Sequence, residues 1–158
     1  MRDMTAPPDP VSLLRQIPLF RQLGLAELYL LAGIGTEQFV PMGTTLGVEE
    51  EPLPEIWVLL QGRIAVMNPA LGQAESFLEA PNVWGVSALV EPYTSFGTGI
   101  ADTDCRMLRI AAVDLRDLAA RNPRLGVRLY EELASHVFVR VQRLIEEVTA
   151  GAEGIGQP

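Results

Sequence analysis

Short apolar or alternating runs fill the middle of the chain and are separated by turn-forming residues. These runs are Gln38–Val40, Thr44–Val48, Ile56–Leu60, Arg63–Asn68, Glu75–Leu78, Gly97–Ala101 and Cys105–Ile110. Glycine, proline, asparagine and aspartate are frequent in the segments between them, and these residues favour turns. Many short strands at spacings of about 8–12 residues are typical of a small barrel or sandwich. No helices of crossover length are interleaved with the runs, which disfavours a doubly wound parallel sheet.

Helical periodicity replaces this pattern on both sides of the β region. Apolar residues recur at helical spacing from Val11 to Phe20, where Pro18 interrupts the run. A second short helix is expected at Leu25–Ala32. After the last strand, a short helix at Leu115–Ala120 should precede a long helix that starts at Pro123.

The long helix carries an apolar stripe that is too long for a small barrel to cover. Its members recur at intervals of three or four residues: Leu125, Leu129, Leu133, Val137, Val141, Leu144 and Val148. The stripe spans about 35 Å at 1.5 Å per residue. Two copies of the chain can bury such a stripe against each other, as coiled-coil dimers do. We therefore expect a homodimer through this helix; the alternative is that the helix only packs back on its own barrel.

Length and composition indicate one globular domain. The chain has 158 residues, of which 48% are hydrophobic and 20% charged, as in ordinary single domains. We expect a disordered lead at residues 1–10, an ordered domain at 11–150 and a disordered tail at 151–158. Within the ordered domain, the barrel should cover residues 36–110 and two helices residues 112–149.

The charge is strongly acidic and unevenly distributed. The chain has no lysine, and residues 22–105 contain eleven acidic residues against one arginine, Arg63, which gives that segment a formal charge of −10. Such a surface repels nucleic acid and anionic lipid. No apolar run reaches the roughly 18–20 residues of a membrane span, and residues 1–10 lack the apolar region of a signal peptide. We expect a cytoplasmic protein with no nucleic-acid partner and no membrane partner.

No catalytic or metal-binding pattern is visible in the sequence. His136 and Cys105 are the single histidine and the single cysteine, so neither a disulfide nor a zinc site of several cysteines and histidines can form. No P-loop, dinucleotide fingerprint or metalloprotease motif is present. We expect a non-enzymatic protein without catalytic residues, metal or cofactor.

Four segments, in their order and spacing, resemble the cyclic-nucleotide-binding domain of the catabolite-activator and fumarate–nitrate regulator superfamily. They are Ile17–Phe20, Phe39–Leu46, Ile56–Val66 and Asp104–Ile110. The resemblance covers about residues 12–148. It implies a mainly β fold with flanking helices: an eight-stranded β-roll (a double-stranded β-helix or jelly roll) with short N-terminal helices and a long C-terminal helix. Regulators of this superfamily also carry a helix-turn-helix after the long helix, and this chain has too few residues there to form one.

The phosphate-binding segment departs from the pattern of ligand-binding members. That pattern reads Phe-Gly-Glu-x-Ala-Leu and, some five residues later, Arg-[Ser/Thr]-Ala; the glutamate binds the ribose and the arginine binds the cyclic phosphate. In this chain the segment Trp84–Leu89 has Val86 at the position of the glutamate, and Ser95 stands at the position of the arginine. The candidate ligand site implied by the resemblance is Gly85, Val86, Ser87, Ala88, Leu89, Ser95 and Phe96.

The loss of the arginine has a large energetic consequence. No arginine or lysine lies between Ile64 and Cys105, so no shift of register supplies a cation. A buried anion without its partner costs several kcal/mol, and each ~1.4 kcal/mol is a factor of ten in affinity. We therefore expect no tight binding of cyclic AMP or cyclic GMP. The chain is interpreted as a regulatory, protein-interaction or oligomerisation module with an unidentified protein partner. The alternative is a small-molecule sensor that binds a different, less anionic ligand, or residual cyclic nucleotide, in the same pocket.

Overall fold

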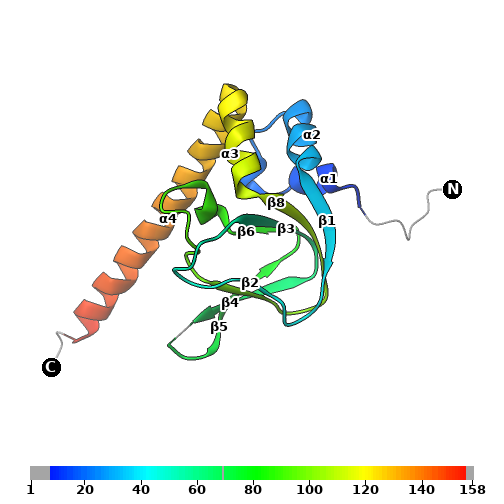
Figure 1. Cartoon of the computed structure of the whole chain (residues 1–158). Coiled ribbons are helices and arrows are strands. Elements are labelled where there is room, and N and C mark those ends of the chain that lie inside the picture. The colour runs from blue at the N-terminus through cyan, green and yellow to red at the C-terminus, as the bar shows by residue number, and fades with distance from the viewer. Residues whose placement is uncertain (1–7, 69, 156–158) are drawn as a thin grey trace.

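Two four-stranded antiparallel sheets face each other and form a roll (Figure 1). The computed structural model describes residues 8–68 and 70–155. One sheet has the order β1-β8-β3-β6 and the other β2-β7-β4-β5. The strands are β1 (Gly35–Val40), β2 (Thr45–Gly47), β3 (Glu55–Gln61), β4 (Arg63–Asn68), β5 (Gln73–Glu79), β6 (Asn82–Trp84), β7 (Thr98–Ala101) and β8 (Cys105–Ala111). The expected mainly β roll of eight strands is confirmed.

One strand, β6, was not predicted from the sequence. The seven predicted runs each overlap an observed strand, whereas β6 lies between the predicted runs Glu75–Leu78 and Gly97–Ala101. β6 has three residues, which is too short to show an alternating pattern. It pairs with β3 in a register that sets Trp84 opposite Trp57, and this pairing places Trp84 beside the candidate ligand site.

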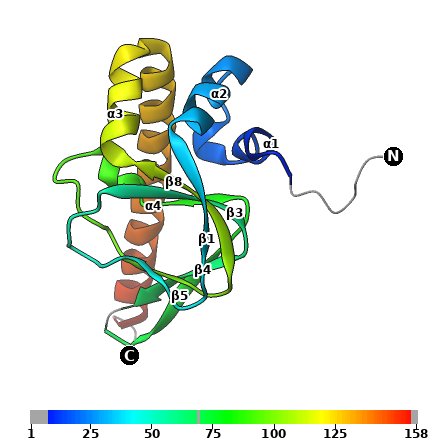
Figure 2. The same cartoon turned by 45° about the vertical axis from the view of Figure 1, so that its right-hand side comes forward.

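Helices gather at one end of the roll, and the last helix runs along its side (Figures 1 and 2). They are α1 (Pro10–Leu14), the 3₁₀ helix η1 (Pro18–Phe20), α2 (Leu25–Gly33), the 3₁₀ helix η2 (Val86–Leu89), α3 (Ala112–Arg121) and α4 (Pro123–Ile155). The expected short N-terminal helices and the long C-terminal helix are therefore confirmed. Pro18 starts η1 and separates it from α1, as its missing N–H and fixed φ favour.

Helices reach into both segments that were expected to be disordered. Asp9 accepts a hydrogen bond from the Val11 N–H at 3.4 Å, so α1 begins at Pro10, the last residue of the expected disordered lead. At the other end α4 continues to Ile155, five residues into the expected disordered tail. A glycine costs a helix about 1 kcal/mol, but each residue added to an existing helix also gains a hydrogen bond. Residues 1–7 and 156–158 of the two predicted segments lie outside the described residues.

A single apolar core joins the helices to the roll. Its fully buried side chains include Phe20 and Leu28 from the N-terminal helices, Met107 from β8, and Leu125 and Leu129 from α4. Burying one such side chain contributes about 1.5–3 kcal/mol. The first half of α4 is therefore part of the protomer's own core, and this fixes where the helix leaves the roll.

Candidate functional site

The candidate ligand site begins at a sharp turn after β6. Gly85 has a φ of +95°, a conformation that residues with a Cβ rarely adopt. A Cβ at this position would also lie 3.1 Å from the carbonyl oxygen of Glu55. The turn directs the chain into η2, where Ala88 and Leu89 are buried. Gly85 is thus required by the backbone itself, whether or not a ligand binds.

Ser95, which stands at the arginine position of the pattern that the sequence resembles, is neutral, and its hydroxyl hydrogen and both backbone groups are bonded within the protein. Its side chain is 3% exposed and its hydroxyl donates a hydrogen bond to the carbonyl oxygen of Gly97. Its backbone N–H donates to Glu51 O, and its carbonyl oxygen accepts from the Glu50 N–H, both at 2.8 Å. The exposed acidic loop Glu49–Glu51 therefore lies directly against the position of the expected cation. This arrangement repels an anion there.

The other candidate residues divide between the interior and the surface. Val86 is partly buried and packs against the core, so no ribose acceptor stands in its place. Phe96 is 68% exposed, which places its ring on the outside of the loop between η2 and β7. The structure therefore does not bring Phe96 together with Ala88 in an enclosed pocket.

An indole ring occupies the space between the two sheets next to η2. Trp84 is 8% exposed and belongs to the first sheet. A Cβ on Gly47 of β2 or on Gly99 of β7 would lie 2.5 Å from an atom of this ring, so the ring contacts the backbone of the second sheet at both glycines. The two glycines thus provide the room that the large side chain needs.

Arg63 and Arg128, which lie far from Ser95 in the sequence, do not supply a replacement cation. Arg63 instead forms ion pairs with Asp102 and Glu79. Arg128 pairs with Glu27, with a distance of 2.8 Å from Nη1 to Oε1. Both guanidinium groups therefore form ion pairs with carboxylates outside the candidate site.

Two side chains from the C-terminal helices hold the carbonyl end of η2. Arg116 of α3 donates from Nη1 to Ala88 O at 2.7 Å. Tyr130 of α4 donates from Oη to Leu89 O at 3.0 Å, and burial raises the pKa of this hydroxyl, which keeps it protonated. Arg116 therefore stabilises the carbonyl end of η2.

Another guanidinium lies at the edge of the candidate site. Arg140 of α4 has its Cζ 5.0 Å from the centre of the Phe96 ring, within the range of a cation–π contact. Because Phe96 is exposed, this contact lies on the outside of the loop. Sequence analysis missed Arg116 and Arg140, since helical periodicity alone does not say which loop an exposed arginine will meet.

The expected dimer stripe divides into two parts. Leu125, Leu129 and Leu133 are at most 6% exposed because they pack in the core of their own protomer. The remaining members are 45–71% exposed: Val137, Val141, Leu144 and Val148. Phe138 and Ile145, which follow stripe members in the sequence, are also exposed and widen the apolar face. The first three residues are thus unavailable for a dimer contact, and the surface stripe begins at Val137.

A buried carboxylate marks the point where α4 is fixed to the N-terminal helices. Glu132 is 6% exposed and accepts hydrogen bonds from Arg21 Nε at 2.8 Å and from the side-chain amide of Gln22. The hydrogen bond from Arg21, followed by that from Gln22, lowers the pKa of Glu132 below its usual value. Glu132 is therefore charged at neutral pH and helps to set the direction in which α4 leaves the roll.

Residues 8–68 and 70–155 contain no group of three or more histidine, cysteine, aspartate or glutamate side chains arranged to hold a metal ion. Within the same residues, no helix combines the length and apolar character needed to cross a membrane.

Comparison with known proteins identifies the fold. No family model matches the chain. A cyclic nucleotide-gated potassium channel of Rhizobium etli is 27% identical over 114 residues, which are 72% of this chain and 31% of the channel. The chain thus spans about a third of the length of that relative.

Solved structures of other proteins have a similar fold. The catabolite activator protein of Thermus thermophilus aligns with a TM-score of 0.73 at 18% identity, over 85% of this chain and 63% of that protein. A cyclic nucleotide-binding domain of Methylobacillus flagellatus aligns with a TM-score of 0.72 at 18% identity, over 90% of this chain and 82% of that domain. These likenesses confirm the fold that the sequence resemblance implied.

Proposed function

We propose that this chain, which has the fold of a cyclic-nucleotide-binding domain, is a regulatory module that forms a homodimer through α4 and does not bind cyclic AMP or cyclic GMP tightly. The fold itself supports a regulatory or sensor role. The dimer and the loss of nucleotide binding are the further steps of the proposal. Each is supported by its own observations.

The observation that carries the proposal is the uncovered apolar stripe on the second half of α4. Val137, Val141, Leu144 and Val148 are spaced by four, three and four residues, which is the spacing of a two-helix seam. Exposed apolar surface of this extent is unusual on a monomer. A second copy of the same helix can cover this stripe, because it carries the same apolar side chains at the same spacing.

Loss of tight nucleotide binding is supported by the chemistry of the candidate site. Val86 offers no oxygen to a ribose, and the Ser95 hydroxyl is already bonded to Gly97. The acidic loop Glu49–Glu51 lies against Ser95. A cyclic phosphate placed there would lose its hydration and meet no cation, which costs several kcal/mol.

The oligomeric state of the full chain tests the proposal. Light scattering during size-exclusion chromatography at about 50 µM protein is expected to give twice the chain mass of 17.3 kDa. A mass of one chain at that concentration would contradict the proposed dimer. An unidentified protein partner, residence in the cytoplasm and the absence of nucleic-acid or membrane partners stay predictions from the sequence.

A second candidate function is a sensor for a different ligand, and the Arg140–Phe96 contact favours it. The guanidinium lies over the ring of the residue that follows Ser95, so a cation is present at the edge of the site. Native mass spectrometry of the protein purified from its own source would reveal a retained small molecule. A single species at the mass of the bare chain or its dimer would remove this candidate.

A further inference from the structure

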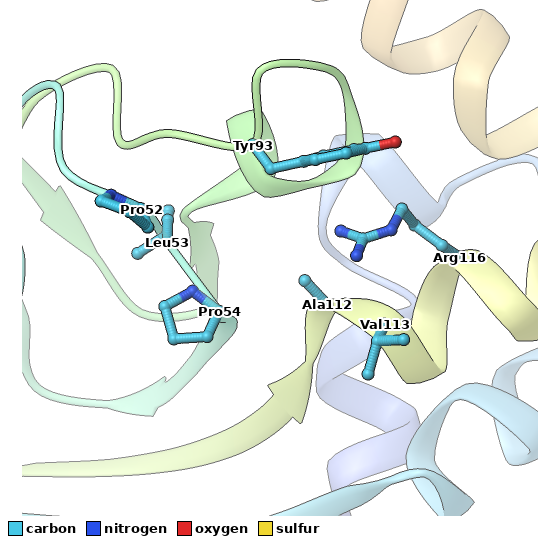
Figure 3. Close-up of a pocket in the computed structure, with 7 residues that line it drawn as sticks. All are labelled: Pro52, Leu53, Pro54, Tyr93, Ala112, Val113 and Arg116. Atoms are coloured by element: carbon cyan, nitrogen blue, oxygen red, sulfur yellow. The ribbon is translucent and has the colours of Figure 1, made fainter.

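A small pocket lies on the outside of the roll, beside η2 but separate from the candidate ligand site (Figure 3). Its volume is about 250 Å³. Pro52, Leu53 and Pro54 form one wall, and Ala112 and Val113 at the start of α3 form another. These walls are apolar. None of the residues expected to bind a nucleotide lines this pocket.

The polar group of the pocket is Arg116. Figure 3 shows its guanidinium pointing into the pocket beneath the ring of Tyr93, with Cζ 4.2 Å from the ring centre. Nη1 donates to Ala88 O at 2.7 Å, and the guanidinium has further N–H donors that this bond does not use. Stacking and this hydrogen bond fix the orientation of the group in the pocket.

Arg116 lines the pocket and has no acidic partner among the described residues, a property that it shares with Arg15, Arg124, Arg140 and Arg143. Arg63, Arg106, Arg109 and Arg128 each pair with a carboxylate from another part of the fold. Asp117, the acidic residue next to Arg116, pairs instead with Arg121 at 3.1 Å. In a chain with a net charge of −8, an anionic ligand would complement an oriented guanidinium that has no acid partner.

We propose that this pocket binds a carboxylate carried on a short branched apolar group. The guanidinium of Arg116 would bond the carboxylate, and the proline, alanine and valine side chains would cover the apolar group. A volume of about 250 Å³ corresponds to roughly eight water molecules at ~30 Å³ each, which fits a small acid. The same chemistry occurs in a free carboxylic acid and in the C-terminal residue of a peptide. The proposal is independent of the α4 dimer.

A titration of the ¹⁵N-labelled full chain followed by NMR tests the proposal. 3-Methylbutanoate is expected to shift the amide signals of Val113 and Arg116 with a Kd of about 1 mM, a usual value for so small a ligand. 3-Methylbutanamide has the same shape without the charge and should bind at least tenfold more weakly. No shift of these signals at about 20 mM acid, or equal binding of acid and amide, would overturn the proposal.

Two variants locate the site, and a matched control tests its specificity. Arg116→Gln should abolish the shifts, and Arg121→Gln on the same helix should leave them unchanged. Because loss of the bond to Ala88 O could disturb η2, Val113→Glu provides a second test: this side chain is 61% exposed, so the fold should persist while the new carboxylate repels the ligand. Unchanged binding in the folded Val113→Glu variant would contradict the proposal.

The source of the carboxylate is decided by a peptide comparison. Gly-Gly-Leu with a free C-terminus is titrated in parallel with its C-terminal amide. Binding of the free peptide at least tenfold tighter than that of 3-methylbutanoate identifies the C-terminus of a protein as the ligand. Equal or weaker binding of the peptide identifies a small acid.

Discussion

Tyr130 on α4 donates a hydrogen bond to the carbonyl oxygen of Leu89, the last residue of η2, over 3.0 Å. The bond ties the candidate ligand site to the part of α4 that is buried in the protomer core. In this chain the position of η2 relative to α4 is therefore set by contacts within the protein. The predictions below test these contacts, the packing around them and the surface that they leave exposed.

Replacing Tyr130 with phenylalanine should lower the stability of the protein. The change removes the hydroxyl and leaves Leu89 O without this donor, at a cost of about 1 kcal/mol. Urea unfolding followed by circular dichroism measures the difference. Tyr29→Phe is the matched control, because Tyr29 is 58% exposed and should change stability by less than about 0.5 kcal/mol. Equal effects of the two changes would show that the bond to Leu89 contributes nothing.

A charge in the exposed stripe of α4 should separate the proposed dimer. Leu144→Glu places a carboxylate at a position that is 49% exposed in the protomer and would face a second α4 in the dimer. Light scattering should give the mass of a single chain. Leu71→Glu, at a residue that is 68% exposed on the turn between β4 and β5, should leave the mass unchanged. A dimer that survives Leu144→Glu would place the interface elsewhere.

Leu133 is unsuitable for the same experiment, although it belongs to the same sequence stripe. It is 6% exposed and lies in the core. A charge there would unfold the protomer by burying an unpaired carboxylate, and loss of the dimer would then say nothing about the interface.

The stabilising effect of Glu132 should depend on pH. Its pKa is lowered in the folded protein, chiefly by the hydrogen bonds from Arg21 and Gln22. Its contribution is therefore complete above the pKa of glutamate in the unfolded chain, and it is lost as the pH falls through the lower folded value. Wild type should have a higher Tm than Glu132→Gln at pH 7, and the difference should shrink below about pH 4. A difference that is constant from pH 7 to about pH 3 would exclude this role.

Packing of Trp84 against two glycines predicts a steric effect. In Gly99→Ala the new Cβ would lie 2.5 Å from Trp84 Cε2, and relieving the clash should cost about 1–3 kcal/mol. Gly151→Ala is the control, since a Cβ there meets no atom within 4 Å and alanine favours a helix. The double variant Gly99→Ala/Trp84→Phe should recover part of the loss. Gly99→Ala with wild-type stability would mean that the indole does not fill this space.

The strands and helices were largely predictable because most of them are long enough to show an apolar run or a periodic spacing of apolar residues. Ile56–Leu60 is an unbroken apolar run, and it forms the buried β3. β6 escaped prediction because three residues cannot display a period. The end of α4 at Ile155 was not predicted, since residues 151–158 include glycines and show no apolar pattern, whereas a long helix can continue through glycine.

The candidate site was predictable in composition but not in its contacts. The neutral residues Val86 and Ser95 follow directly from the sequence. The bonds of Ser95 to the loop Glu49–Glu51 depend on segments more than 40 residues apart. Helical spacing placed Leu133 and Val137 on one stripe, yet the first is buried and the second is 53% exposed. Periodicity identifies the apolar face of a helix. The length of the roll decides how much of that face the roll buries.

The most direct test of the account is a calorimetric titration of the full chain with cyclic AMP and cyclic GMP. Because Ser95 and Val86 provide neither a cation nor a ribose acceptor, we predict no saturable heat up to about 1 mM of either nucleotide. Saturable binding with a Kd of about 1 µM or tighter would contradict the central claim that this cyclic-nucleotide-binding fold no longer binds its ligand tightly.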